Sequence, residues 1–143
     1  MTENEVFLLD TNILVYAYDG TDIDKHITSK KIINKCLDGE YQIAISPQNL
    51  SEFFSVTTSK SLLDKADAIK VISDIIVFPG WKKIGFDHIT VLTAAKISDE
   101  YKMSYWDSLL AATMKQNSVL KIYTENTKDF KIPWLVVENP FEK

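Results

Sequence analysis

The stretch Val6-Phe7-Leu8-Leu9-Asp10-Thr11-Asn12 decides which fold this chain adopts. Its first four residues form an unbroken apolar run, which predicts a strand that is buried on both faces. Strands of this kind belong to parallel sheets that carry helices on both sides. The run stops at Asp10, and the carboxyl ends of parallel strands face the ligand crevice in open α/β sheets. We therefore expect an α/β domain with a polar site where this strand ends.

The rest of the chain alternates between short β-rich runs and helical patterns, as α/β domains with a mainly parallel sheet do. Ser46-Pro47 predicts a helix start, Gly39 stands where glycine ends helices, and an apolar stripe from Ala68 to Ile76 has helical spacing. Further strands are expected at 42–45, 120–124 and 135–137, and helices at about 24–38, 47–58, 68–76, 87–101 and 105–116. The expected order is β-α-β-α-α-α-α-β-β, in a single domain over residues 1–143.

The composition excludes several classes of protein. With 143 residues, 45% of them hydrophobic and 25% charged, the chain has the mixture of an ordinary globular domain. One cysteine and two histidines cannot build an internal disulfide or a structural zinc site. No apolar run approaches the roughly 20 residues of a membrane helix, and the polar N-terminus is unlike a signal peptide. We expect a cytoplasmic protein with no membrane partner.

Common catalytic motifs are also missing from the sequence. The four glycines are too scattered for a phosphate-binding loop or a dinucleotide fingerprint. No Gly-x-Ser-x-Gly elbow marks a nucleophilic serine, and Cys36 lies within a predicted helix with only Lys35 as a cationic neighbour. The remaining candidates for chemistry are carboxylates in unusual positions.

Two aspartates occupy positions where a carboxylate is unusual. Asp10 follows the first strand, either as a ligand-binding group or as the cap of a short helix. Asp107 shares a helical face with Leu110, where an unpaired carboxylate is costly. The alternative is a capping box, with Ser104 as the N-cap and Asp107 at N3. Spacing leaves both pairs of alternatives open, and the neighbouring Trp106 is expected in the core.

The other acidic candidates are less distinctive. Glu52 points away from the apolar face of its helix, as an ordinary solvated glutamate does. Glu125 and Asp129 follow the strand that ends at Thr124, again at a carboxyl end. This stretch is alternatively a polar loop in which Thr124 or Asn126 caps a helical turn.

Four motifs in order resemble a known family. They are Leu8-Leu9-Asp10-Thr11-Asn12, Ser51-Glu52-Phe53, Trp106-Asp107-Ser108-Leu109-Leu110-Ala111-Ala112 and Thr124-Glu125-Asn126-Thr127-Lys128-Asp129-Phe130. The set covers nearly the whole chain and resembles the PIN-domain ribonucleases, most of all the VapC-type toxins of bacterial toxin–antitoxin pairs. The resemblance implies a three-layer α/β/α fold around a central, mainly parallel sheet.

The resemblance also implies a metal site. In this family three or four carboxylates gather on Mg²⁺ or Mn²⁺, and by motif match Asp10, Glu52 and Asp107 would be catalytic ligands. The family's fourth acid often stands where this chain has Asn126, which makes Asp129 the nearer substitute as fourth ligand. Residues that would orient the ligands or a metal-bound water are Asn12, Thr124 and Asn126.

The charge balance agrees with an acidic site. Carboxylate oxygens are the ligands that Mg²⁺ and Mn²⁺ prefer. The chain has twenty acidic residues against sixteen basic ones, and its net charge is −4. Without the four proposed ligands, sixteen acidic residues would balance sixteen basic ones, which indicates that the acidity is partly local to the site.

The sequence thus predicts a metal-dependent endoribonuclease, the toxin of a toxin–antitoxin pair, with RNA as its substrate. The resemblance further implies a homodimer and a cognate antitoxin protein as partners. All sixteen basic residues are lysine, so phosphate contacts must come from lysine rather than from the bidentate arginine fork. Candidate RNA contacts, which are alternatively ordinary solvated lysines, are Lys30, Lys31, Lys60, Lys65, Lys82 and Lys83.

Other functions compete with this prediction. An RNA-processing PIN nuclease without an antitoxin is one alternative, and a non-catalytic PIN-like module that only binds RNA or protein is another. An aspartyl-phosphate phosphatase of the haloacid-dehalogenase type needs a second aspartate two residues after the first. The chain has Asn12 at that position, which argues against this class.

Overall fold

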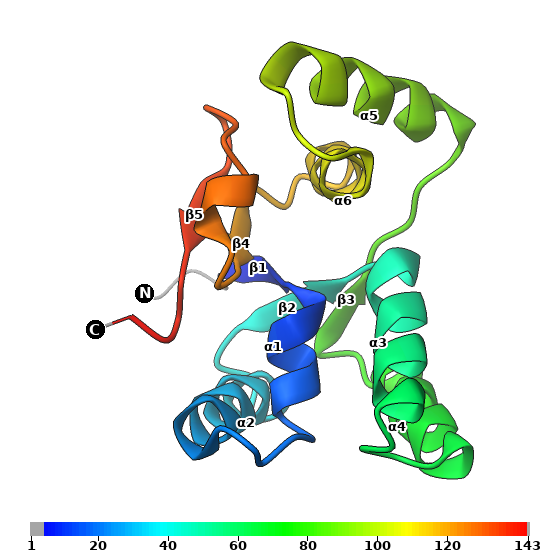
Figure 1. Cartoon of the computed structure of the whole chain (residues 1–143), viewed down its shortest axis with the longest axis vertical. Coiled ribbons are helices and arrows are strands. Elements are labelled where there is room, and N and C mark those ends of the chain that lie inside the picture. Colours follow the sequence, from blue (N-terminus) through cyan, green and yellow to red (C-terminus); the bar gives the residue numbers. More distant parts are fainter. Residues whose placement is uncertain (1–4, 143) are drawn as a thin grey trace.

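A five-stranded sheet forms the middle layer of the protein (Figure 1). The computed structural model describes residues 5–142. The strand order is β3-β2-β1-β4-β5, and every neighbouring pair is parallel. The strands are β1 (Val6–Leu9), β2 (Gln42–Ile45), β3 (Trp81–Lys83), β4 (Lys121–Tyr123) and β5 (Val136–Glu138). The apolar run Val6–Leu9 is therefore the central strand, as predicted.

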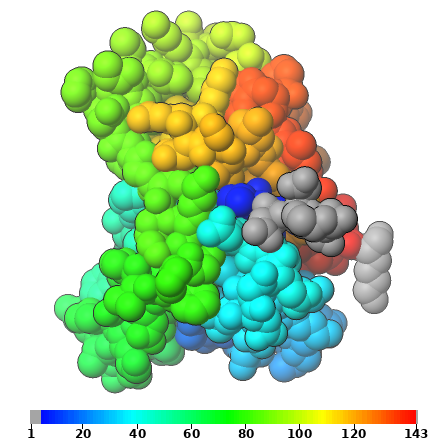
Figure 2. All heavy atoms as spheres, turned by 180° about the vertical axis from the view of Figure 1, so that it is seen from behind, coloured from blue at the N-terminus to red at the C-terminus, as the bar shows by residue number. Residues whose placement is uncertain are grey.

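Helices cover both faces of this sheet, which confirms the three-layer α/β/α architecture. In Figure 1, α5 and α6 lie above the sheet and α1 to α4 lie below it. Seen from behind, α5 and α6 form the upper part of the surface and α2 and α4 the lower part (Figure 2). The helices are α1 (Thr11–Tyr16), α2 (Ile23–Leu37), α3 (Pro47–Ser59), α4 (Lys65–Val77), α5 (His88–Tyr101) and α6 (Tyr105–Gln116), and a 3-10 turn, η1, spans Thr127–Asp129.

The side chains of β1 divide between two cores, because successive residues of a strand point to opposite faces. Leu8 is buried against α5 and α6, in a core that includes Leu110 and Met114. Phe7 and Leu9 are buried on the other face, in a core that α1 to α4 complete. A strand buried on both sides holds its carboxyl end in a fixed place, and Asp10 is the next residue.

Local sequence signals explain where the helices begin and end. The Ser46 side chain caps α3 by accepting from the backbone N–H of Asn49, and Pro47 opens the helix. Gly39 follows α2 with a φ of 81°, a left-handed conformation that glycine adopts without strain. Asp87 caps α5 as predicted. Across residues 5–142, no helix has the length and apolar character needed to cross a membrane.

The structure corrects three predictions about the fold. The predicted element order omitted β3, because Trp81-Lys82-Lys83 is too short and too charged to look like a strand. It also lacked α1 as an element of its own. On α4, Ile69 and Ile76 are exposed, and only part of the predicted apolar stripe faces the core.

Candidate active site

Asp10 lies where β1 ends and α1 begins. Its Oδ1 accepts a hydrogen bond from the backbone N–H of Thr11 at 2.8 Å and so caps α1. Its own backbone N–H donates to the carbonyl oxygen of Tyr123 on β4, which ties the residue to the neighbouring strand. The two alternatives for Asp10 are therefore compatible, since the residue caps a helix and also stands at the carboxyl edge of the sheet.

Thr124 fixes the second oxygen of this carboxylate. The Thr124 side chain is fully buried, and its hydroxyl donates to Asp10 Oδ2 at 2.8 Å. The same hydroxyl oxygen accepts from the backbone N–H of Asn126 at 3.0 Å. Thr124 thus contacts Asp10 directly, whereas the side chains of Asn126 and Asn12 are exposed.

Glu52 joins the site through Thr11. The Thr11 hydroxyl donates to Glu52 Oε1 at 2.8 Å and accepts from Asn49 Nδ2 at 3.1 Å. Asn49 is itself fully buried and belongs to the capping box with Ser46. The prediction that Glu52 is exposed is correct, but the carboxylate is anchored at the start of α1 rather than free in solvent.

Asp107 and Asp129 share a cavity of about 490 Å³. Asp107 lies half-buried in the first turn of α6, and its backbone N–H donates to the Ser104 hydroxyl at 3.2 Å. Asp129 ends η1 and is exposed. Three lysines that the sequence did not single out, Lys102, Lys128 and Lys131, line the same cavity.

The electrostatics connect all four carboxylates. Burial raises the pKa of Asp10, the hydrogen bonds from Thr124 and Thr11 lower it, and the charges of Asp107 and Glu52 raise it again, for a net increase. Burial likewise raises the pKa of Asp107, against the lowering effect of Ser104, and the charge of Asp129 raises it further. Carboxylates whose pKa is raised by burial and by neighbouring negative charges are typical of functional sites.

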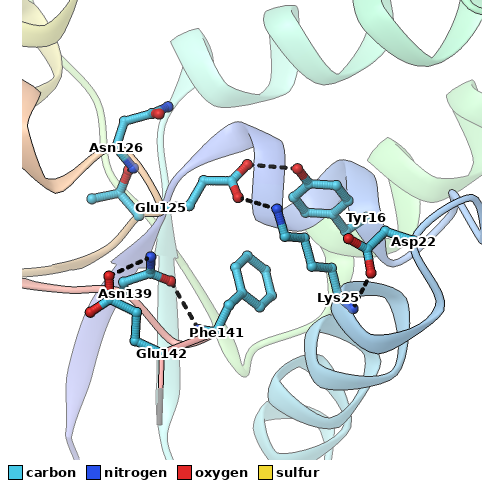
Figure 3. A network of polar contacts seen from close by, with 9 residues as sticks. Tyr16, Asp22, Lys25, Glu125, Asn126, Asn139, Phe141 and Glu142 are labelled. Carbon is cyan, nitrogen blue, oxygen red and sulfur yellow. Dashed lines mark hydrogen bonds and ion pairs between the residues drawn. The ribbon is translucent and has the colours of Figure 1, made fainter.

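A second polar network holds the segment that carries Thr124 (Figure 3). Glu125 Oε1 accepts from the Tyr16 hydroxyl at 2.6 Å, and its Oε2 pairs with Lys25 Nζ at 2.8 Å. Lys25 Nζ also lies 5.3 Å from the ring centroid of Tyr16 and 5.6 Å from that of Phe141. Glu125 therefore links α1, α2 and the chain after β4, and its carboxylate is engaged outside the cluster.

The donor set suits a hard divalent cation, since it consists of four carboxylates from four segments of the chain. As their side chains lie, however, no three acidic, histidine or cysteine groups within residues 5–142 are close enough to hold one ion together. Like charges repel, so these carboxylates stay apart unless a cation neutralises them. The chemistry of the donors fits Mg²⁺ or Mn²⁺, and closure around an ion requires movement of side chains.

Sequence reasoning missed the polar residues that hold the acids. Thr11 and Asn49 connect Asp10 with Glu52, and a threonine directly after the strand-ending aspartate was the available signal. It also misplaced Trp106, which is 63% exposed instead of lying in the core. Of the six lysines proposed for RNA contact, none lines the cavity of Asp107 and Asp129.

Comparison with known proteins identifies the family. The model of the PIN domain matches residues 7–133, and the chain therefore belongs to the PIN-domain family. No curated protein matches the sequence. Among solved structures, a toxin–antitoxin complex from Klebsiella pneumoniae is similar with a TM-score of 0.69 at 23% identity, over 96% of this chain and 99% of that one.

Two further structures show the same fold. VapBC2 from Rickettsia felis, bound to a DNA fragment from its promoter, has a TM-score of 0.65 at 23% identity, over 94% of this chain and 98% of that one. VapC20 from Mycobacterium tuberculosis, a sarcin–ricin loop cleaving toxin, has a TM-score of 0.63 at 15% identity, over 85% and 90% of the two chains. The structural neighbours of this chain are thus toxins of toxin–antitoxin complexes.

Proposed function

We propose that this protein is a metal-dependent endoribonuclease that hydrolyses phosphodiester bonds in RNA. The observation that carries the proposal is the position of Asp10 at the carboxyl edge of the sheet, joined to Glu52 through Thr11. Burial raises the pKa of Asp10, and the nearby charges of Asp107 and Glu52 add to that increase. Such a cluster is destabilising without a cation, so it is difficult to explain as a structural feature. Membership of the PIN-domain family supports the same function.

Each polar residue has a task in this proposal. Asp10, Glu52, Asp107 and Asp129 would hold Mg²⁺ or Mn²⁺, which when bound activates water and offsets charge on the phosphate. Thr124 and Thr11 keep the carboxylates of Asp10 and Glu52 in place. A carboxylate of the cluster accepts the proton of the attacking water. The lysines of the adjoining cavity, which are Lys102, Lys128 and Lys131, bind the phosphates on either side of the cut.

We further propose that the protein is the toxin of a toxin–antitoxin pair, acts in the cytoplasm and forms a homodimer. Its structural neighbours were crystallised as toxin–antitoxin complexes, which supports this role. An apolar cavity of about 490 Å³ between α2 and α4 is suited to bind an apolar segment of the antitoxin. Val77, at its rim, is 75% exposed. Val77→Glu should abolish binding of the cognate antitoxin and leave RNA cleavage intact.

The test of the nuclease function is direct. Purified protein is incubated with total RNA in Mg²⁺ or in chelator, and the new 5′ ends are mapped. We expect cleavage at defined positions that requires Mg²⁺ and is lost in Asp10→Asn. Cleavage that persists in Asp10→Asn would come from a contaminant, and no cleavage in any divalent metal would refute the function.

A further inference from the structure

A second hollow adjoins the carboxylate cluster on the side of Glu52. It measures about 420 Å³, within the range of roughly 300–1,000 Å³ that is typical of small-ligand sites. Its walls come from the first turns of α3, from Leu109 on α6 and from two exposed aromatic residues, Phe86 and Trp106. Most of this lining is apolar, and Glu52 is its one charged residue.

Trp106 has an exposed side chain, and its main chain is hydrogen-bonded to a neighbouring helix. It directly precedes Asp107 in the first turn of α6, and its side chain is 63% exposed. The ring of Tyr105 packs edge-on against the indole, with 5.2 Å between centroids. Gln48 Nε2 donates to the carbonyl oxygen of Trp106 at 3.1 Å, which ties the first turns of α3 and α6 together. The indole is thus an exposed apolar surface next to Asp107, one of the candidate catalytic acids.

The polar groups of the hollow argue for an amphipathic occupant. Covering Glu52 with a purely apolar surface would remove the carboxylate from water without compensation, which is costly. A flat ligand with an apolar face and N–H groups at its edge suits both the Trp106 indole and the Glu52 carboxylate.

We propose that this hollow binds an unpaired nucleobase of the RNA substrate, next to the phosphate that is cut, with the base stacked on Trp106. The proposal deepens the function proposed above, because it takes RNA as the substrate. Aromatic side chains bind the bases of single strands by stacking, without a need for a particular sequence. Glu52 belongs both to the hollow and to the carboxylate cluster, so a base in the hollow and its own phosphate at the acids are adjacent.

Binding is measured with a single-stranded RNA ten-mer of mixed sequence and an abasic ten-mer with the same backbone. The Kd comes from the fluorescence anisotropy of a dye at the RNA end, and stacking on Trp106 is followed separately by tryptophan fluorescence. All variants carry Asp10→Asn, which keeps the RNA intact. We expect the intact ten-mer to quench fluorescence in the Asp10→Asn protein. Trp106→Phe should remove the quenching and keep the affinity within about threefold, because phenylalanine still stacks.

Trp106→Ala should raise the Kd about 5- to 150-fold, the equivalent of ~1–3 kcal/mol for one stacked base. The abasic ten-mer should bind the Asp10→Asn protein as weakly as the intact one binds Trp106→Ala. Ile89→Ala, which changes an exposed apolar residue outside the hollow, serves as the matched control and should leave the Kd unchanged. An unchanged Kd in Trp106→Ala, or quenching that survives in Trp106→Phe, refutes the base site.

Two further outcomes separate this inference from its alternatives. If Trp106→Ala changes the sedimentation of the protein without RNA, Trp106 contacts a second copy of the chain and the base site is refuted. If the protein without Asp10→Asn cleaves total RNA while Trp106→Ala binds normally, the base site fails and the nuclease function stands. If Trp106 is quenched but no RNA is cut, the nuclease function fails and the base site stands.

Discussion

Replacing Asp10 with asparagine should stabilise the protein in chelator. Asp10 Oδ1 and Glu52 Oε1 each lie 2.8 Å from an atom of Thr11, which limits their separation to about 9 Å with ordinary bond lengths. Two unit charges at this distance repel by about 2 kcal/mol at an effective dielectric constant of 20. The partial burial of Asp10 and the charge of Asp107 add to that cost.

The substitution also loses favourable contacts, but these are smaller. Asparagine keeps the hydrogen bond from the Thr11 backbone N–H and caps a helix about as well as aspartate. Its amide nitrogen cannot accept from the Thr124 hydroxyl but can donate to the hydroxyl oxygen, so a bond to a charged acceptor is exchanged for a neutral one at a cost of about 1 kcal/mol. The balance is a gain in unfolding free energy of about 1 kcal/mol or more, which raises the Tm by about 2–4 °C.

Melting curves of both proteins in chelator and in Mg²⁺ measure this balance. With Mg²⁺ at about 100 times its Kd, the wild type gains about 2.7 kcal/mol, because the ion binds only the folded state. Asp10→Asn lacks one ligand and gains less, so the order of the two Tm values reverses. If Asp10→Asn is the less stable protein in chelator, the carboxylate is chiefly a helix cap and the argument from mutual repulsion is wrong.

Three other predictions concern the same region. In chelator the wild type should lose stability relative to Asp10→Asn as the pH rises from about 4 to 7. The reason is that a carboxyl with a raised folded-state pKa stabilises the fold only while protonated. The same dependence of unfolding free energy on pH in both proteins, measured by urea titrations, would contradict this. Asp129→Asn should weaken Mg²⁺ binding and cleavage less than Asp107→Asn does, since Asp129 is exposed. Equal losses in calorimetry and cleavage assays would show that Asp129 holds the ion as strongly as Asp107 does. Tyr16→Phe should lower the unfolding free energy by about 1 kcal/mol in chelator and in Mg²⁺ alike, because it removes a hydrogen bond to Glu125 outside the cluster; an effect seen only in Mg²⁺ would connect Glu125 with the metal.

The sequence predicted those parts of the fold and site that local patterns encode. The apolar run before Asp10 identified the central strand, because a strand buried on both faces favours an unbroken run of apolar residues. Ser46-Pro47 and Asp87 located two helix starts through their capping chemistry. These features depend on neighbours within a few residues along the chain.

Features that depend on tertiary contacts were not predictable in the same way. The anchoring of Glu52 by Thr11 requires α3 to lie beside α1, 41 residues apart in the chain. β3 exists because Ile43 to Ile45 of β2 offer it an edge for pairing, not because Trp81-Lys82-Lys83 favours a strand. Trp106 was predicted to lie in the core, but it is 63% exposed in the first turn of α6.

Helix termini explain how an arginine-free chain tolerates these acids at one edge. Asp10 is the N-cap of α1 and Asp107 lies in the first turn of α6, where the backbone N–H groups provide partial positive charge. This effect contributes about 0.3–1 kcal/mol per carboxylate, less than the roughly 2 kcal/mol by which one pair repels. The remaining imbalance favours a cation or a cationic partner over any apolar occupant of the cluster. Because carboxylate repulsion exceeds the stabilisation from the helix termini, the stability of the fold depends on metal and pH through these few acids. The two cores that flank the sheet keep the acids in position.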